Sequence, residues 1–502
     1  MSRNSEHRFK ASIVGLAMSA VTACGPAIVT TSPPVITAPP PPTLDLTIPP
    51  LLGPPPTLLV PPIVTRVLPN GLRIVVVEHH ELPLADILLE VRTGGEADPA
   101  SKPGTASLVA SLLPEGTSTR NALQIGDQQA LLGISLNANS GWEQSTVAIH
   151  TPTAQIDSAL GLLADVILNP AFSSADLDRV RKARLTALQQ QRDRGPSIAD
   201  RAFATAVFGA NNPYGRPLAG TEASLASLTR DELTRFYSTF FRPNNSILLV
   251  VGDVHPDEIE RRARMLFGAW ANGDVPVVAT NTVSAPKGTT VIIVDKAGAA
   301  QSSVRIGGIG APRSTKDYFA LQVMNTLLGG SFGSRLNQNL RETHAFTYGA
   351  SSNFSYRRSP GPYTAAAEIV SAKTDSALIQ FIKELRAIRD TVPAAELERT
   401  KRYLQLGLPQ RFETTGGIAG QLLQLLTYDI PLDFYNTAVQ NIGAVTQSDV
   451  QRVAREYIDP TRLTLVVVGD RKSIEPGIRA LGLGEVVIHD VRDVLGEPPT
   501  PR

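Results

Sequence analysis

Short apolar runs alternate with segments of helical periodicity along most of the chain. The runs Arg73–Val77, Ile87–Val91 and Ile247–Val251 are rich in Val, Ile and Leu, which predicts strands. Two longer stretches repeat apolar residues every three or four positions, which predicts helices. The positions at helical spacing are Leu160, Leu163 and Ile167, followed by Leu177, Val180, Arg184 and Leu188. Strands and helices that alternate in this way indicate an α+β fold.

A short buried helix is expected within Gly104–Thr117, which reads GTASLVASLLPEGT. Pro103 and Gly104 precede its apolar stripe, and Pro114 and Gly116 end it. The stripe itself consists of Leu108, Leu112 and Leu113.

The pattern of apolar and polar residues occurs twice in the chain, at an offset of about 217 residues. Gly71–Glu78 matches Gly288–Asp295, and Leu248–Asp253 matches Leu465–Asp470. A near-constant spacing across strands and turns indicates duplication, so we expect two homologous domains in tandem. Residues 275–287 lack strong periodicity and contain prolines, as expected of a linker between them.

Composition narrows the classes of function. The 502-residue chain is 42% hydrophobic and 19% charged, with a net charge of +1, so nothing in it favours nucleic acid as a partner. The single cysteine, Cys24, excludes an internal disulfide and a thiolate-rich metal site. No apolar run reaches the roughly 18 residues of a membrane-spanning helix.

The first residues are typical of a targeting signal. Basic residues precede the apolar run Ala11–Ala23, and Val21-Thr22-Ala23-Cys24 resembles a bacterial lipobox. We expect a signal peptide over 1–23 and lipidation of Cys24, an ordinary secretory signal being the alternative. Gly25 favours the outer membrane, facing the periplasm, in a bacterial cell envelope.

A proline-rich stretch follows over 24–62. Because proline enforces extended geometry, it predicts a semi-rigid tether. A proline-rich recognition ligand is the competing interpretation.

Several motifs occur in the order found in one enzyme family. They are Leu68-Pro69-Asn70-Gly71-Leu72, Asn212-Pro213-Tyr214-Gly215-Arg216-Pro217 with Gly220-Thr221, and the Val-Val-Gly-Asp strand ends. From Val64 to about Ile488 the chain resembles the zinc peptidases of the insulinase/pitrilysin family, M16. The resemblance implies two tandem α/β-sandwich domains of the M16/LuxS-like metallohydrolase type, which form a clamshell when two chains pair. We place these domains at 63–274 and 288–488, followed by a tail over 489–502.

The resemblance also identifies a lost active site. The family's pattern is H-x-x-E-H on a helix, where two His bind zinc and the Glu activates water. Here Ser107, Ala110 and Ser111 occupy those positions, and the third ligand falls at or beside Ala187. No carboxylate lies between Arg179 and Arg192. We therefore expect no catalytic residue, metal or cofactor in this chain, which would be inactive alone.

The adjacent His79 and His80 are a weaker metal candidate. Neighbours in a strand point to opposite faces, so the pair cannot chelate as i and i+4 residues of a helix do. We interpret them as a solvated strand end.

A second group of residues typical of the family is present in the second half of the chain. The segment with Gly329 and Gly330 leads to Arg341 and Tyr348, which resemble the Arg/Tyr pair that reaches substrate beside the zinc. The glycines would admit an extended peptide, and Ala345 stands where the family usually has Gly. The alternative is that Arg341 ends a solvated helix and Tyr348 is half-buried in a strand.

A further substrate contact is expected in the first half. The stretch Leu136–Asn139 resembles the edge strand on which the family binds peptide by β-addition, or it is an ordinary strand that faces a partner.

Two hypotheses of function follow. The first is a non-catalytic, substrate-positioning subunit that pairs with a separate zinc-bearing M16 chain, as in mitochondrial processing peptidase and bacterial two-chain enzymes. The second is a lipid-anchored peptide-binding or scaffold protein that has lost proteolysis and self-associates. A peptidase active by itself is disfavoured because ligands and base are both missing.

Overall fold

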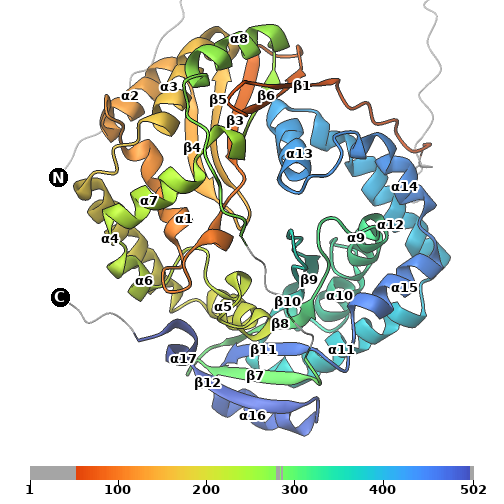
Figure 1. Ribbon diagram of the computed structural model, residues 1–502. Coiled ribbons are helices and arrows are strands. Elements are labelled where there is room, and N and C mark those ends of the chain that lie inside the picture. The colour runs from red at the N-terminus through yellow and green to blue at the C-terminus, as the bar shows by residue number, and fades with distance from the viewer. Residues whose placement is uncertain (1–52, 279–282, 284–285, 498–502) are drawn as a thin grey trace, which may run out of the picture. The chain divides into compact units, whose positions relative to one another are not determined.

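The computed structural model describes residues 53–278, 283 and 286–497 (Figure 1). The predicted signal peptide, Cys24, most of the tether, part of the linker and the last five residues lie outside the described residues. The described part from Pro54 onward forms one compact unit by contacts. None of its helices has both the length and the apolar character needed to cross a bilayer.

The first half of the chain forms a six-stranded mixed sheet with the order β1-β2-β6-β3-β5-β4. Only the β2–β6 pair is parallel. The strands are β1 (Ile63–Val67), β2 (Arg73–Glu78), β3 (Leu84–Val91), β4 (Ser135–Ser140), β5 (Ser145–Pro152) and β6 (Ser246–Gly252). The helices are α1 (Thr105–Leu112), α2 (Ala122–Leu132), α3 (Ile156–Leu168), α4 (Ser174–Gln191), α5 (Gly195–Phe208), α6 (Glu222–Ser227), α7 (Arg230–Phe240) and α8 (Pro256–Phe267).

The second half repeats this sheet, in the order β12-β7-β11-β8-β10-β9. Its strands are β7 (Thr290–Asp295), β8 (Gln301–Ile309), β9 (Thr347–Phe354), β10 (Pro362–Val370), β11 (Thr464–Gly469) and β12 (Glu485–Asp490). Its helices are α9 (Tyr318–Leu328), α10 (Arg335–Asn337), α11 (Thr374–Asp390), α12 (Ala394–Gly407), α13 (Thr415–Thr427), α14 (Ala438–Ala444), α15 (Gln447–Tyr457), α16 (Arg471–Ala480) and α17 (Val491–Leu495). A π-helical segment, Gln338–Thr343, follows α10.

Five strands of each sheet correspond position for position, which confirms the duplication. The sixth differs, because β1 comes from the start of the first half and runs antiparallel to β2, whereas β12 comes from the end of the second and runs parallel to β7. The expected tail over 489–502 therefore begins inside the sheet and continues into α17.

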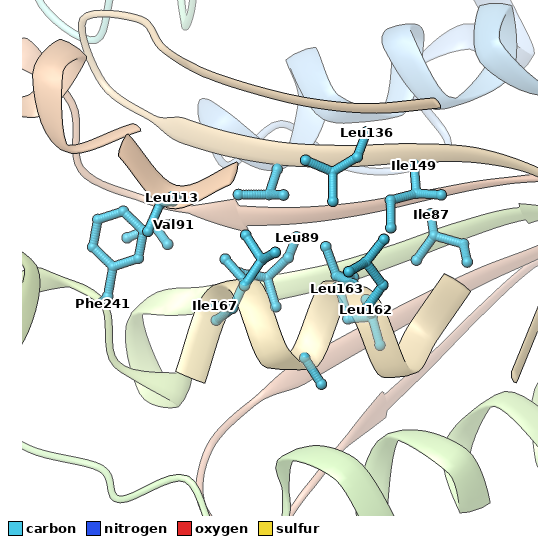
Figure 2. Close-up of a cluster of buried hydrophobic side chains, with 14 of the residues drawn as sticks. Ile87, Leu89, Val91, Leu113, Leu136, Ile149, Leu162, Leu163, Ile167 and Phe241 are labelled. Atoms are coloured by element: carbon cyan, nitrogen blue, oxygen red, sulfur yellow. The ribbon is translucent and has the colours of Figure 1, made fainter. Parts of the chain in front are cut away.

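One face of the first sheet packs on helices of its own half. Leu162, Leu163 and Ile167 of α3 contact the apolar side chains of β3, β4 and β5 (Figure 2). Along β2 and β6 alternate residues point to this face, Ile74, Val76, Leu248 and Val250 among them. These residues are fully buried or nearly so, which explains the predicted strands.

The other face of each sheet is covered by a helix of the opposite half. Val75 and Leu249 pack in one cluster with Leu422 of α13, which belongs to the second half. Conversely, Val466 of β11 packs in one cluster with Ile198 and Phe203 of α5, which belongs to the first. The central strands β6 and β11 are thus buried on both sides, which is why they read as continuous apolar runs.

Candidate functional site

Helix α1 is the expected buried helix, and an acidic side chain fixes its start. The Asp98 carboxylate accepts hydrogen bonds from the backbone N–H of Gly104 (2.6 Å) and of Ala106 (2.8 Å). Burial nevertheless raises the pKa of Asp98 to about 7. Gly104 has a φ of +92°, and a Cβ there would lie 2.6 Å from the Cα of Gly220, so this close crossing requires glycine.

A guanidinium lies between Ser107 and Ser111, the two serines that the resemblance places at the zinc-binding histidine positions. Arg184 of α4 donates from Nη1 to Ser107 Oγ (2.8 Å) and from Nη2 to Ser111 Oγ (2.6 Å). Nη2 also contacts the Ser107 carbonyl at 3.2 Å, to which the Ser111 hydroxyl donates at 3.0 Å. The two serines that replace the histidines therefore hold a side-chain cation.

This cation has no acidic partner among the described residues. Burial alone lowers the pKa of Arg184, and no carboxylate interaction offsets it. A guanidinium remains protonated at neutral pH even so. Two hydroxyls, a carbonyl and a fixed positive charge do not fit a zinc ion, whose ligands are His, Cys or carboxylate. The residues present are therefore incompatible with the family's metal at this position.

The remaining positions of the lost motif contribute no chemistry. Ala110 is fully buried and offers no proton acceptor. Ala187 is exposed on α4, and the side chain that reaches α1 is Arg184, one turn earlier. The sequence analysis missed Arg184 as a site residue. Its place on an otherwise apolar stripe with Val180 and Leu188 was the available signal, because a charge on a core-facing stripe needs a partner.

Arg341 and Tyr348 lie on an exposed part of the second half. Arg341 belongs to the π-helical segment, 4.8 Å from the Phe332 ring centre, and contacts Glu342 at 3.2 Å. Tyr348 stands near the start of β9 and is 89% exposed, so it is not half-buried in the strand. Phe332 is 65% exposed. One cation and two aromatic rings are thus available to a ligand; their contact with substrate stays a prediction.

The neighbouring glycines have a structural reason of their own. A Cβ on Gly329 would lie 2.3 Å from the backbone N of Ser352 in β9, and one on Gly330 would lie 2.9 Å from Thr326 of α9. These glycines therefore allow their own segment to pack closely against β9 and α9. Ala345 has a φ of +51°, a conformation that favours glycine. This accounts for the Gly that the family usually has there.

Four of the described strands end a sheet: β1 and β4 in the first sheet, β12 and β9 in the second. The outer edge of β9 is occupied, because the backbone N–H groups of Ser352 and Ala350 donate to the Gly329 carbonyl and to Asn337 Oδ1. β4 pairs only with β5 and β9 only with β10, so each ends its sheet. The expected edge strand at Leu136–Asn139 is therefore an edge, and α1 packs against it. Peptide binding on that edge stays a prediction.

Comparisons with known proteins agree with this architecture. Residues 73–222 match the model of the insulinase family (peptidase family M16), and residues 227–404 match that of the peptidase M16 inactive domain. An uncharacterized zinc protease of Mycobacterium leprae is 28% identical over 396 residues, which are 78% of this chain and 88% of that protein. The non-peptidase homolog YmxG of Helicobacter pylori is 25% identical over 402 residues, 79% of this chain and 91% of its own.

A solved structure shows the same fold. The peptidase M16 inactive domain from Pseudomonas fluorescens superposes with a TM-score of 0.76 at 23% identity, covering 81% of this chain and 98% of its own. Together the two family models cover most of the first half and the first part of the second, from β2 into α12. The chain is a member of peptidase family M16 that lacks the family's zinc motif.

Proposed function

We propose that this chain is the non-catalytic, substrate-positioning subunit of a two-chain M16 zinc peptidase that acts on peptides in the cell envelope. The observation that carries the proposal is the guanidinium of Arg184 between Ser107 and Ser111. It leaves no place for zinc at that position, while Phe332 and Tyr348 remain exposed and Arg341 beside them is half-buried. Loss of the zinc site together with retention of the Arg341/Tyr348 pair is what a subunit would show if a partner chain supplied the metal.

The chemistry of the exposed group suits contact with a peptide. A guanidinium keeps its charge and presents a rigid fork of N–H donors, and a phenol adds one more donor. Both can donate to a peptide carbonyl, and to the oxyanion that forms when a partner's zinc-bound water attacks it. The outer edge of β4 offers backbone groups to an extended peptide beyond Leu136, whose own N–H donates to Gln129 Oε1.

The test is reconstitution with a zinc-bearing M16 chain from the same cell. The chain alone is expected to cleave no peptide, and the mixture is expected to do so. Arg341→Ala and Tyr348→Phe should each lower kcat/KM of the mixture at least tenfold, about 1.4 kcal/mol. The matched controls Arg399→Ala and Tyr403→Phe, both exposed on α12, should leave it unchanged.

Undiminished activity in both variants would remove the substrate-contact role. Peptide binding without any gain of activity in the mixture would favour the alternative of a peptide-binding or scaffold protein.

The envelope location is a proposal that rests on Cys24 and the signal before it. A lipid on Cys24 would anchor the chain without spanning the bilayer. Incorporation of labelled fatty acid that disappears in Cys24→Ser, together with release of that variant from the outer-membrane fraction, is the expected result.

A further inference from the structure

Four ionisable side chains meet where β2 and β6 end. These strands are parallel neighbours, and Glu78 at the end of β2 is in register with Gly252 at the end of β6. The two following segments therefore leave the sheet side by side and bring His80 together with Asp253 and His255. The sequence analysis considered only His79 and His80, because His255 is remote in the chain.

The contacts within this cluster are close. Glu78 Oε2 lies 3.0 Å from His80 Nε2 and 3.7 Å from His255 Nδ1. One ligand atom from each of these three residues lies within 4.8 Å of the other two. Bonds of about 2.0–2.2 Å in a tetrahedral zinc site separate neighbouring ligand atoms by about 3.3–3.6 Å. Glu78, His80 and His255 thus have the spacing of a three-ligand site after small side-chain adjustments.

Asp253 contacts the ring nitrogen of His80 that faces away from Glu78. Its Oδ1 lies 2.7 Å from Nδ1 of His80, while Nε2 of the same ring faces Glu78. A neutral imidazole carries only one N–H and can donate to only one of the two carboxylates. The contacts of His80 with Asp253 and with Glu78 are therefore both favourable only when a second proton or a metal ion is bound at the ring nitrogen that lacks the N–H. A carboxylate on one ring nitrogen and a metal on the other is the common arrangement of metal-binding histidines.

We infer that Glu78, His80 and His255 bind a divalent transition-metal ion, with zinc the best match. Asp253 orients His80, and solvent occupies the fourth position, because His80 and His255 are both exposed. This site is distinct from the family's zinc position on α1 and α4. The expectation that the chain binds no metal was drawn from the lost motif on α1 and α4, whereas this inference concerns the separate cluster at the ends of β2 and β6.

The test is zinc binding to the untagged full chain, measured by calorimetry and by metal analysis after dialysis. One zinc per chain is expected. His80→Ala and His255→Ala should each weaken binding at least tenfold. Asp253→Asn should weaken it about 10–100-fold, as loss of such a carboxylate typically does. Cobalt in place of zinc should give the intense visible absorption of a tetrahedral site, lost in His255→Ala.

Two controls keep the outcome clear. His344→Ala removes an exposed histidine outside the cluster and should leave affinity unchanged. The cluster lies at the surface, so melting temperatures with a chelator present should match across the variants. Binding of less than one zinc per chain, or equal affinity in the parent, His80→Ala and His255→Ala, would overturn the inference.

Discussion

At the scale of single residues, the loss of the zinc motif is a replacement rather than a deletion. A metal ion that holds α1 to α4 in active relatives would carry positive charge, and Arg184 supplies positive charge at the same place. The serines are short enough to leave room for the guanidinium and polar enough to accept from it. A buried cation without hydrogen-bond acceptors would cost several kcal/mol, so these hydroxyls are needed for the helix pair to pack.

The substitution Ser111→Ala is therefore expected to destabilise the chain. It removes the 2.6 Å hydrogen bond to Arg184, and a bond to a charged group contributes about 1.5–3 kcal/mol. Urea unfolding should show this loss, whereas Ser101→Ala at an exposed position should change the free energy of unfolding little. Equal stability of the two variants would show that Arg184 does not depend on the serine.

At the scale of elements, α13 is attached to β3 by hydrogen bonds as well as by apolar packing. Thr415 near its start donates to Asp86 Oδ2 at 2.6 Å, and Thr427 at its end donates to Glu90 Oε1 at 2.8 Å. Glu90 is fully buried, and burial raises its pKa to about 7 despite the Thr427 hydrogen bond and two nearby arginines. The contact between a strand of one half and a helix of the other thus contains a carboxyl that prefers to be neutral.

Stability is expected to fall as pH rises through this pKa. The folded state binds the Glu90 proton more tightly than the unfolded state. The stability that this proton contributes is therefore fully present below the ordinary glutamate pKa of 4.5, and it is lost as the pH rises to about 7. The shift corresponds to a loss on the order of 3 kcal/mol. Burial also raises the pKa values of Glu96 and Asp98 to about 7, so these two groups add to the same loss of stability with rising pH.

The variant Glu90→Gln isolates the part of the pH dependence of stability that comes from Glu90. Its amide oxygen can still accept from Thr427, and it cannot ionise. Denaturant unfolding at pH 5 and pH 8 should show a smaller drop in stability for Glu90→Gln than for the parent chain. A drop of the same size would assign the pH dependence to the other carboxyls.

At the scale of the whole molecule, each half completes the core of the other. α5 lies on the second sheet and α13 on the first, so neither sheet has two covered faces without the opposite half. Two domains related by duplication would be expected to fold separately if each buried its own core. The exchange of helices predicts instead that the two halves unfold in one transition.

Trp270 allows a direct test in a Trp142→Phe background, because Trp270 packs on the core of the first half, whereas Trp142 lies against Arg357 of the second. Leu378 is fully buried in the second half's own core, and Leu422 of α13 is fully buried against the first sheet. Leu378→Ala and Leu422→Ala should each cost about 2–5 kcal/mol. Both should lower the unfolding midpoint seen by tryptophan fluorescence as much as that seen by circular dichroism. A fluorescence midpoint unmoved by Leu378→Ala would mean that the halves unfold independently.

The sequence by itself determined the duplicated α+β fold, the short helix α1 and the loss of the family's zinc motif, because periodicity, repeated motifs and residue chemistry are local properties. The strands at Arg73–Val77 and Ile247–Val251 were predicted to within a residue or so at each end. The exposed position of Tyr348 required the structure, whereas the edge position of β4 had been expected from the resemblance and is confirmed by the strand order.

Only the tertiary structure brought Arg184 onto the two serines, His255 beside His80, and α13 onto the sheet of the other half. Each of these contacts joins residues that are far apart in the chain, more than 70 positions in the case of Arg184 and Ser111. Such pairs are set by how helices and strands pack on one another, and no local pattern of hydrophobic and polar positions encodes that packing.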